Sequence, residues 1–478
     1  MLRSSTARAQ AWFVVLAVCL AVIGVIGLGA APSQAAGLPD NKGTDFWLMF
    51  NENFTPQSLK LFITGDAPTT GTVSSAAFAS IPFSVTPGTV TTVNIPVSAM
   101  VTGNETTQNK GIHVVANAEV TVYGLNPAGA TTDAFLGLPI DVLGTEYIVL
   151  AMDNASANFV DGSQLGIVGT VNGTVVTITP RLTTGSHPAG TSFTITLNQG
   201  QAYQLRNGTA GTGDVTGTVI TSTAPVAVFG GHKCATFPEG RFYCDHLVEQ
   251  LPPTNTWGKN FVTMPLATRL NGDTFRFLAQ TNGTQVSVNG TLVATLNLGQ
   301  HHERIIAGPA HITATEPILV AQYSNSSTYD SAVADPFMML IPPFEQFQGG
   351  YTVINLGSPF VTNFINIVKP SAGSVSVDGV PIPSGSFAAI GTSGFSGIQK
   401  SVGAGTHVLT GSLPFGAFIY GFGNYDSYGY SGGASFAPIA VATNLTLAPP
   451  TGSANVNTQH CVTATVTDQN NNPLNGIR

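Results

Sequence analysis

One strand motif occurs four times in this chain of 478 residues, and this repetition limits the possible folds more than any other feature. The copies follow one another at intervals of about 90 to 110 residues. They read HVVANAEVTVYGLN (113–126), VITSTAPVAVFGGH (219–232), HITATEPILVAQYSN (311–325) and HVLTGSLPFGAFIYGFG (407–423). Self-similarity at a fixed period is typical of an array of like structural units, so we expect four such units.

Each repeat carries about six to eight short stretches in which apolar and polar residues alternate, separated by Gly, Pro and Asn. This alternation is typical of half-buried β-strands, and Gly and Asn suit the turns between them. A β-propeller blade needs only about 40 to 50 residues, roughly half of this period. We therefore predict an all-β chain of four tandem β-sandwich-like modules.

The shared segments that open and close each repeat place the module boundaries. The modules are predicted at 43–130, 131–233, 234–327 and 328–437. The sequence leaves open whether they form a ring-like or a rod-like block.

The N-terminus has the three parts of a secretory signal peptide. Arg3 and Arg8 precede an apolar run at 11–31, and the small residues of 33–36 follow it. We predict that residues 1–35 are a signal peptide, that the mature chain is secreted or extracellular, and that it does not insert into a membrane after cleavage. An uncleaved membrane anchor is the alternative.

The C-terminal segment differs from the repeats. HCVTATVTDQNNNPLNGIR (460–478) resembles the opening strands of bacterial immunoglobulin-like domains of the invasin and intimin type. Two or three strands leave an edge and an apolar face uncovered. We therefore predict that 442–478 is a truncated immunoglobulin-like domain of a longer bacterial protein, in which Cys461 pairs beyond residue 478 and the missing part attaches the chain to the cell surface.

The charge of the chain bears on its partners. The formal net charge is −8, and the 16 Lys and Arg residues are spread along the sequence. Nucleic-acid binding relies on a concentrated basic footprint, so we exclude nucleic acid as a partner. Nothing in the sequence requires a cofactor.

The stretch HKCATFPEGRFYCDH (232–246) contains Cys234 and Cys244, with His232, His246 and Asp245 beside them. It could be a zinc site, a catalytic cluster or a disulfide. Structural zinc sites usually space their paired ligands by two to four residues, whereas His and Cys here are separated by one. Adjacent strand residues point to opposite faces, so Asp245 is badly placed to orient its neighbour. Export to an oxidising compartment favours a Cys234–Cys244 disulfide, with no metal and no catalytic residue.

Three other groups have both a functional and a structural interpretation. His301-His302-Glu303 is a metal candidate or a polar strand end, and Tyr420–Tyr430 is a binding patch or core aromatics around a Gly-rich turn. Four carboxylates could act as acid and base in a glycosidase or could cap turns and form ion pairs: Glu249, Glu345, Asp330 and Asp335. We favour the structural interpretation in each case.

The segment CDHLVEQLPP (244–253), followed by TWGK (256–259), resembles the N-terminal domain of the IgG Fc-binding protein family. Further matches are GTDFW (43–47), DPFMM (335–339) before IPP (341–343), GTH (405–407), YGFG (420–423) and DSYGY (426–430). Together they cover roughly residues 43–437. The family's namesake is a secreted mucosal glycoprotein, so the resemblance implies a secreted, non-enzymatic, extracellular interaction module.

We therefore expect a secreted or cell-surface, non-enzymatic binding or adhesion module that recognises an extracellular protein or glycan through loops on a rigid β scaffold. The alternatives are a secreted carbohydrate-active or peptide-cleaving hydrolase and a structural component of a surface coat. The sequence does not single out the ligand-binding residues.

Overall fold

The computed structural model describes residues 39–55, 58–154, 162–238, 240–330, 334–436, 442–448 and 463–468. Contacts group residues 39–478 into one unit. The predicted signal peptide lies outside the described residues. Within the part of the chain that is described, no helix is long and apolar enough to cross a membrane.

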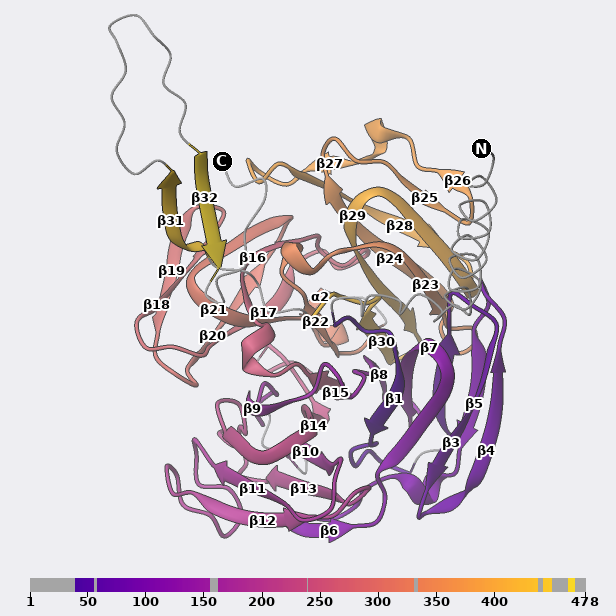
Figure 1. Cartoon of the computed structure of the whole chain (residues 1–478), viewed down its shortest axis with the longest axis vertical. Helices are drawn as coiled ribbons and strands as arrows, with labels where there is room; N and C mark the ends of the chain where they lie inside the picture. The colour runs from indigo at the N-terminus through magenta and orange to yellow at the C-terminus, as the bar shows by residue number, and fades with distance from the viewer. Residues whose placement is uncertain are drawn as a thin grey trace, which may run out of the picture. The chain divides into compact units, whose positions relative to one another are not determined.

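The strands form four antiparallel sheets that follow one another along the chain (Figure 1). The first contains β1 (Gly43–Leu48), β2 (Leu59–Thr64), β3 (Thr69–Ser75), β4 (Phe78–Val85), β5 (Thr91–Ile95), β7 (Ile112–Pro127) and β8 (Thr132–Leu136). The second contains β6 (Thr106–Gln108), β9 (Gly144–Ile148), β10 (Ser163–Gly169), β11 (Thr174–Thr179), β12 (Phe193–Leu197), β13 (Ala202–Asn207), β14 (Val219–Ala235) and β15 (Asp245–Leu251).

The other two sheets repeat this order. The third contains β16 (Gly258–Thr263), β17 (Asp273–Ala279), β18 (Thr284–Val288), β19 (Thr291–Leu296), β20 (His301–Ile306), β21 (Ala310–Ser324) and β22 (Phe337–Ile341). The fourth contains β23 (Gln348–Asn355), β24 (Thr362–Pro370), β25 (Val375–Val377), β26 (Val380–Pro381), β27 (Ala388–Ala389), β28 (Phe395–Val402), β29 (Gly405–Gly423) and β30 (Asp426–Ser431). The described helical segments are short: η1 (Val97–Ala99), η2 (Thr254–Thr256), η3 (Phe344–Gln346), η4 (Ser384–Ser386) and α2 (Ser327–Asp330). The prediction of an all-β chain with four tandem sandwich-like modules is confirmed.

The repeated motif lies on one long strand of each sheet: β7, β14, β21 and β29. The first half of β14 pairs with β9 and β11, and its second half pairs with β10 and β15. The two halves meet at Pro225, and Pro317 and Pro414 occupy the corresponding places in β21 and β29. Proline has no N–H to donate to a neighbouring strand, so it suits the position at which the long strand changes its pairing partners. Each repeated motif thereby supplies strands to both halves of its own curled sheet.

The strand that follows each long strand lies innermost. These four inner strands contact one another in a closed ring, because β8 contacts β15 and β30, and β22 contacts the same two. Figure 1 shows the inner strands in the middle of the four sheets.

The first three sheets end beyond the predicted module boundaries because β8, β15 and β22 pair back onto the preceding long strand. The modular division of the sequence stays a prediction.

The first and fourth sheets meet where the ring closes. The N–H of Asn41 donates to the carbonyl of Ala434 at 3.0 Å, and the N–H of Phe436 donates to that of Pro39 at 2.7 Å. The hydroxyl of Tyr123 in β7 donates to the carbonyl of Gly432 at 2.7 Å. The beginning and the end of residues 39–436 therefore hold each other in place.

The last two strands form a sheet of their own. β31 (Ala442–Ala448) pairs antiparallel with β32 (Thr463–Asp468). The remainder of 442–478, including Cys461, lies outside the described residues. The truncated immunoglobulin-like domain stays a prediction.

Candidate functional site

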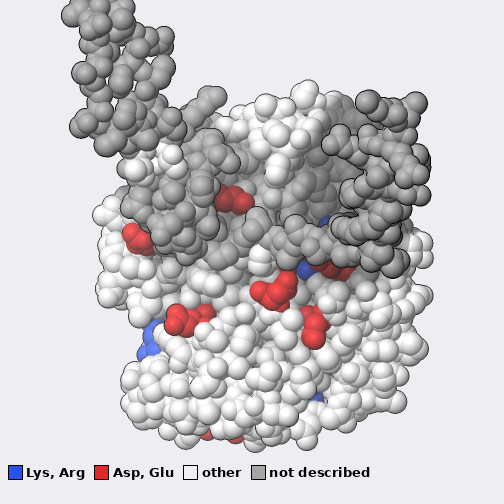
Figure 2. Space-filling model, in the orientation of Figure 1, with Lys and Arg blue, Asp and Glu red and all other residues white. Residues whose placement is uncertain are grey.

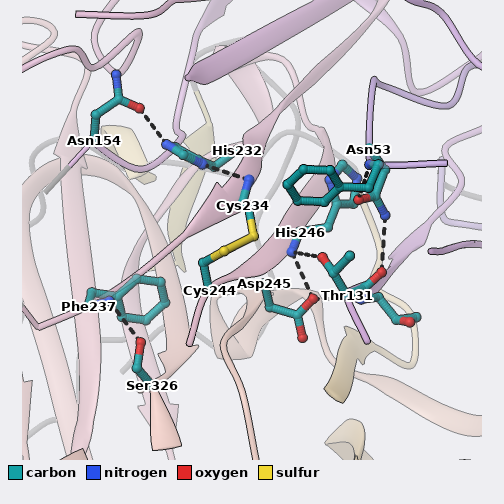
Figure 3. The surroundings of a disulfide bond; sticks show 12 residues. Asn53, Thr131, Asn154, His232, Cys234, Phe237, Cys244, Asp245, His246 and Ser326 are labelled. Carbon is teal, nitrogen blue, oxygen red and sulfur yellow. Dashed lines mark hydrogen bonds between the residues drawn. A yellow bond between two sulfur atoms is a disulfide. The ribbon is translucent and has the colours of Figure 1, made fainter. Parts of the chain in front are cut away.

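Cys234 and Cys244 flank the loop between β14 and β15. The structure joins them in a disulfide, with their Cα atoms 5.0 Å apart (Figure 3). Because β15 pairs with β14, the bridge closes a hairpin within the second sheet. Cysteines joined in this way are not available as a nucleophile or as metal ligands.

Removing this bridge should weaken the fold. The Cys234→Ala/Cys244→Ala double variant is expected to lose about 2 to 3 kcal/mol of unfolding free energy, because a short closed loop is released in the unfolded chain. Urea unfolding of both proteins, with and without dithiothreitol, measures the loss. The reductant should lower the wild-type midpoint and leave that of the variant unchanged; equal midpoints for the two oxidised proteins would contradict the prediction.

His232 and His246, the other residues of the predicted cluster, are fully buried. The Nε2 of His232 lies 2.7 Å from Oδ1 of Asn154, and its Nδ1 accepts the N–H of Cys234 at 3.0 Å. The Nε2 of His246 lies 3.1 Å from Nδ2 of Asn126. Burial lowers the pKa of each imidazole to about 3, so both are neutral at physiological pH. They act as neutral hydrogen-bonding groups in the interior.

The other candidates from the sequence are mostly occupied by structural contacts. Glu249 accepts the N–H of Leu340 at 3.0 Å, and Glu345 accepts Nδ2 of Asn260 at 2.8 Å. His301, His302 and Glu303 open strand β20, and Glu303 pairs with Arg276 at 2.9 Å. Asp330 pairs with Arg269 at 2.7 Å. In the described ranges, no group of three or more His, Cys, Asp or Glu is placed to hold a metal ion.

Asp133, which the sequence analysis missed, lies where the four inner strands meet. Its Oδ2 accepts the N–H groups of Val248 in β15 and Met338 in β22, each at 3.1 Å. Its Oδ1 accepts those of Ala134 in β8 at 2.8 Å and Gly429 in β30 at 3.4 Å. Burial raises the pKa of this carboxyl, and the four N–H donors act in the opposite direction. One fully buried side chain thus bonds to all four inner strands.

Three further aspartates lie at the starts of the inner strands. Asp245 and Asp426 are the first residues of β15 and β30, and Asp335 precedes β22 by two positions. In the first sheet a threonine takes this place: the N–H of Thr132 donates to Asp245 Oδ1 at 2.6 Å, and its hydroxyl donates to Asp426 Oδ2 at 3.1 Å. We call Asp245, Asp335 and Asp426 the acidic cluster.

The acidic cluster is buried and incompletely bonded. The three residues are at most 2% exposed, and one oxygen of each has no hydrogen-bond partner among the residues that the structure describes. Burial, with the Asp426 carboxylate nearby, raises the pKa of Asp335 to about 7. Burial likewise raises the pKa of Asp426 to about 7, and burial together with the neighbouring carboxylates raises that of Asp245. The cluster is a concentrated source of negative charge whenever its members ionise.

A pocket of roughly 500 Å³ opens beside the acidic cluster. Each sheet contributes a residue one or two positions before the start of its inner strand, and the loops add aromatic side chains. The lining is Phe54, Ala130, Thr236, Phe242, Tyr243, Cys244, Asp335 and Tyr425. Phe242 is 57% exposed, Tyr243 50% and Phe54 45%, and the rings of Tyr243 and Tyr425 lie 4.6 Å apart. We call this the axial pocket.

Four of the pocket-lining residues belong to the stretch 232–246 that the sequence singles out: Thr236, Phe242, Tyr243 and Cys244. Tyr420, Tyr428 and Tyr430 of the predicted aromatic cluster are core residues, whereas Tyr425 is 36% exposed and lines the pocket. Asp335 is the one member of the four candidate carboxylates that lines it.

The fold and the pocket together define a multi-repeat β scaffold that presents a loop-lined recess at the centre of its ring. The sequence model of a family described as "IgGFc binding protein" matches residues 133–421, and the chain belongs to this family. It is 27% identical over 373 residues to the IgGFc-binding protein of Homo sapiens. That alignment covers 75% of this chain and 7% of the human protein, so the chain spans a small part of its relative's length.

Proposed function

We propose that this chain is a secreted or cell-surface, non-enzymatic module that binds an extracellular protein at the axial pocket. The observation that carries the proposal is the joint construction of the pocket by segments next to the inner strands of all four sheets, with exposed aromatic side chains at its wall. Aromatic residues in a recess are typical of the energetically dominant part of a protein interface. The name of the human relative makes the Fc part of IgG the first partner to test.

A hydrolase is the less well supported function. A glycosidase needs two carboxyl groups on either side of the scissile bond. Glu249, Glu345 and Asp330 are each engaged in a structural contact, and Glu249 is fully enclosed. This leaves Asp335, among those candidates, beside the pocket.

The test is a binding assay on the intact chain against IgG Fc fragments and mucins, each in native and deglycosylated form. We expect reversible binding to at least one of these proteins that survives deglycosylation and leaves the partner uncleaved. Phe242→Ser should weaken binding by at least about tenfold, as for a residue at the centre of an interface. Leu292→Ser is the matched control, because Leu292 is 54% exposed on the outer strand β19.

Two results would oppose the proposal. Release of a cleaved product would support the hydrolase. Equal loss of binding in the Phe242→Ser and Leu292→Ser variants would show that the axial pocket is not the binding site.

A further inference from the structure

We propose that the axial pocket receives a basic side chain, arginine or lysine, of the partner protein. This inference rests on the proposed function and specifies the chemistry of its site. Its basis is the combination of an aromatic wall, an acidic cluster at one side, and the absence of a basic residue from the pocket lining that the structure describes.

The wall suits the carbon stem and the charged head of such a side chain. Phe242, Tyr243 and Tyr425 offer apolar ring surface, against which the methylene groups of lysine or arginine pack. A cation within about 6 Å of an aromatic ring centroid is attracted by the ring electrons. The pocket margin already contains such a contact, because Nζ of Lys233 lies 5.3 Å from the centroid of the Phe54 ring. Lys233 also pairs with Glu52 at 3.0 Å.

The acidic cluster supplies the attraction for a positive charge. Asp335 lines the pocket, and Asp245 and Asp426 interact electrostatically with it and with each other. Burial strengthens charge interactions because the medium screens them poorly. A cation in the pocket would therefore be attracted by Asp335 directly and by the other two carboxylates at longer range.

Among the described residues, the charged groups around the cluster offset this attraction only in part. Asp133 adds to the negative charge at Asp245, while Arg269 acts on Asp335 with the opposite sign. Arg269 is fully enclosed and pairs with Asp330 at 2.7 Å, and it also interacts with Asp273. Its charge is thus shared among carboxylates outside the cluster.

The backbone holds two of the wall residues in an unusual conformation. Tyr243 has φ +72° and Tyr425 has φ +54°, in the left-handed region that bulky residues seldom adopt. Glycine would occupy these positions without strain. The presence of two tyrosines there, with ring centroids 4.6 Å apart, indicates that these positions supply aromatic ring surface to the pocket.

The chain as a whole carries more acidic than basic residues. It has 24 Asp and Glu against 16 Lys and Arg. Figure 2 shows that charged side chains are sparse on the described part of the face in view and that most of those visible are acidic. Arg241, beside the wall, is stacked over the ring of Tyr329 at 5.3 Å.

The test is titration of the intact chain with Nα-acetyl-arginine amide and Nα-acetyl-lysine amide, followed by NMR. Nα-acetyl-citrulline amide is the control, since it keeps the shape of arginine without its charge; galactose and CaCl₂ test the glycan and metal alternatives. We expect the arginine or lysine probe to bind at least about tenfold more tightly than the citrulline probe, as a charge-assisted contact requires. Equal affinities, preference for galactose or CaCl₂, or no binding by the basic probes would overturn the proposal.

Two variants locate the site. Asp335→Asn keeps the side-chain shape and should weaken binding of the basic probe by about tenfold. Tyr243→Gly should also weaken it without harming the fold, because glycine favours the φ of +72°. Leu292→Ser should leave it unchanged. Unaltered affinity in both pocket variants would overturn the proposal.

Binding should also depend on pH. A cation favours the ionised carboxylates, and Asp335 and Asp426 have pKa values of about 7 in the free protein. Affinity for the arginine probe should therefore rise between pH 5.5 and 8, while that for the citrulline probe stays level. A fall in arginine affinity over this range would contradict the proposal.

The function and the inference can fail separately. If the basic probes fail to bind while Phe242→Ser still abolishes capture of a partner protein, the axial pocket is an interface without a basic occupant. If neither a probe nor a partner protein binds, the proposed function itself is wrong.

Discussion

Replacing Asp133 by alanine is expected to remove about 4 kcal/mol or more of unfolding free energy. The substitution leaves four backbone N–H groups without their acceptor in the interior, those of Ala134, Val248, Met338 and Gly429. Each such buried, unpaired group costs about 1 to 3 kcal/mol. Since a typical domain has about 5 to 15 kcal/mol in total, much of the population should be unfolded or aggregated. Urea unfolding followed by tryptophan fluorescence measures the loss.

Two variants control for this result. Asp133→Asn keeps one oxygen acceptor and should be intermediate, while Asp66→Ala should change stability by less than about 0.5 kcal/mol because its ion pair with Lys42 is on the surface. A midpoint for Asp133→Ala equal to that of Asp66→Ala would show that Asp133 does not hold the inner strands together.

The second large effect is expected at Arg276, which joins the second and third sheets. Its Nη1 donates to Asp214 at 2.8 Å and to the carbonyl of Ala151 at 2.9 Å, and its Nε donates to Glu303 at 2.9 Å. Arg276→Met should cost about 3 to 5 kcal/mol, because Asp214 would keep a buried charge without its partner. Chemical denaturation at pH 7 tests this.

The pH dependence of that loss identifies its cause. The nearby Arg276 holds the pKa of Asp214 below its ordinary value although burial raises it, so the folded wild type contains an ionised Asp214. Without the guanidinium, burial would raise this pKa, and the folded variant would take up a proton as the pH falls. The deficit of Arg276→Met should therefore be smaller at pH 4 than at pH 7. The Arg276→Met/Asp214→Asn double variant should lose less than the sum of the single losses; strict additivity would contradict the account.

The fold class and the number of repeats follow from the sequence because strand alternation and the long-strand motif are local signals. The same is true of the Cys234–Cys244 pair, whose short separation and predicted export favour a disulfide. Which strands pair with one another is harder to predict from the sequence. β8, β15 and β22 turn back onto the preceding long strand, and tight turns alone do not say which sheet a short strand joins.

The candidate site could be predicted only in fragments. Asp133 is bonded by backbone N–H groups from three other sheets, and backbone groups carry no signature in a sequence. The pocket wall combines Phe54, Phe242 and Tyr425, which come together only when the ring closes. One signal was present but not used: an aspartate opens or closely precedes three of the four inner strands, in a chain with only 8% charged residues.

The central claim is that a partner protein binds where the four sheets meet. Hydrogen–deuterium exchange of the intact chain, with and without a partner identified in the binding assay, tests it most directly. We predict slower exchange on binding in the loops at 128–131, 240–244 and 424–426, and no change in the outer strands β19 and β20. Slower exchange confined to the outer strands, with none at these loops, would contradict the account.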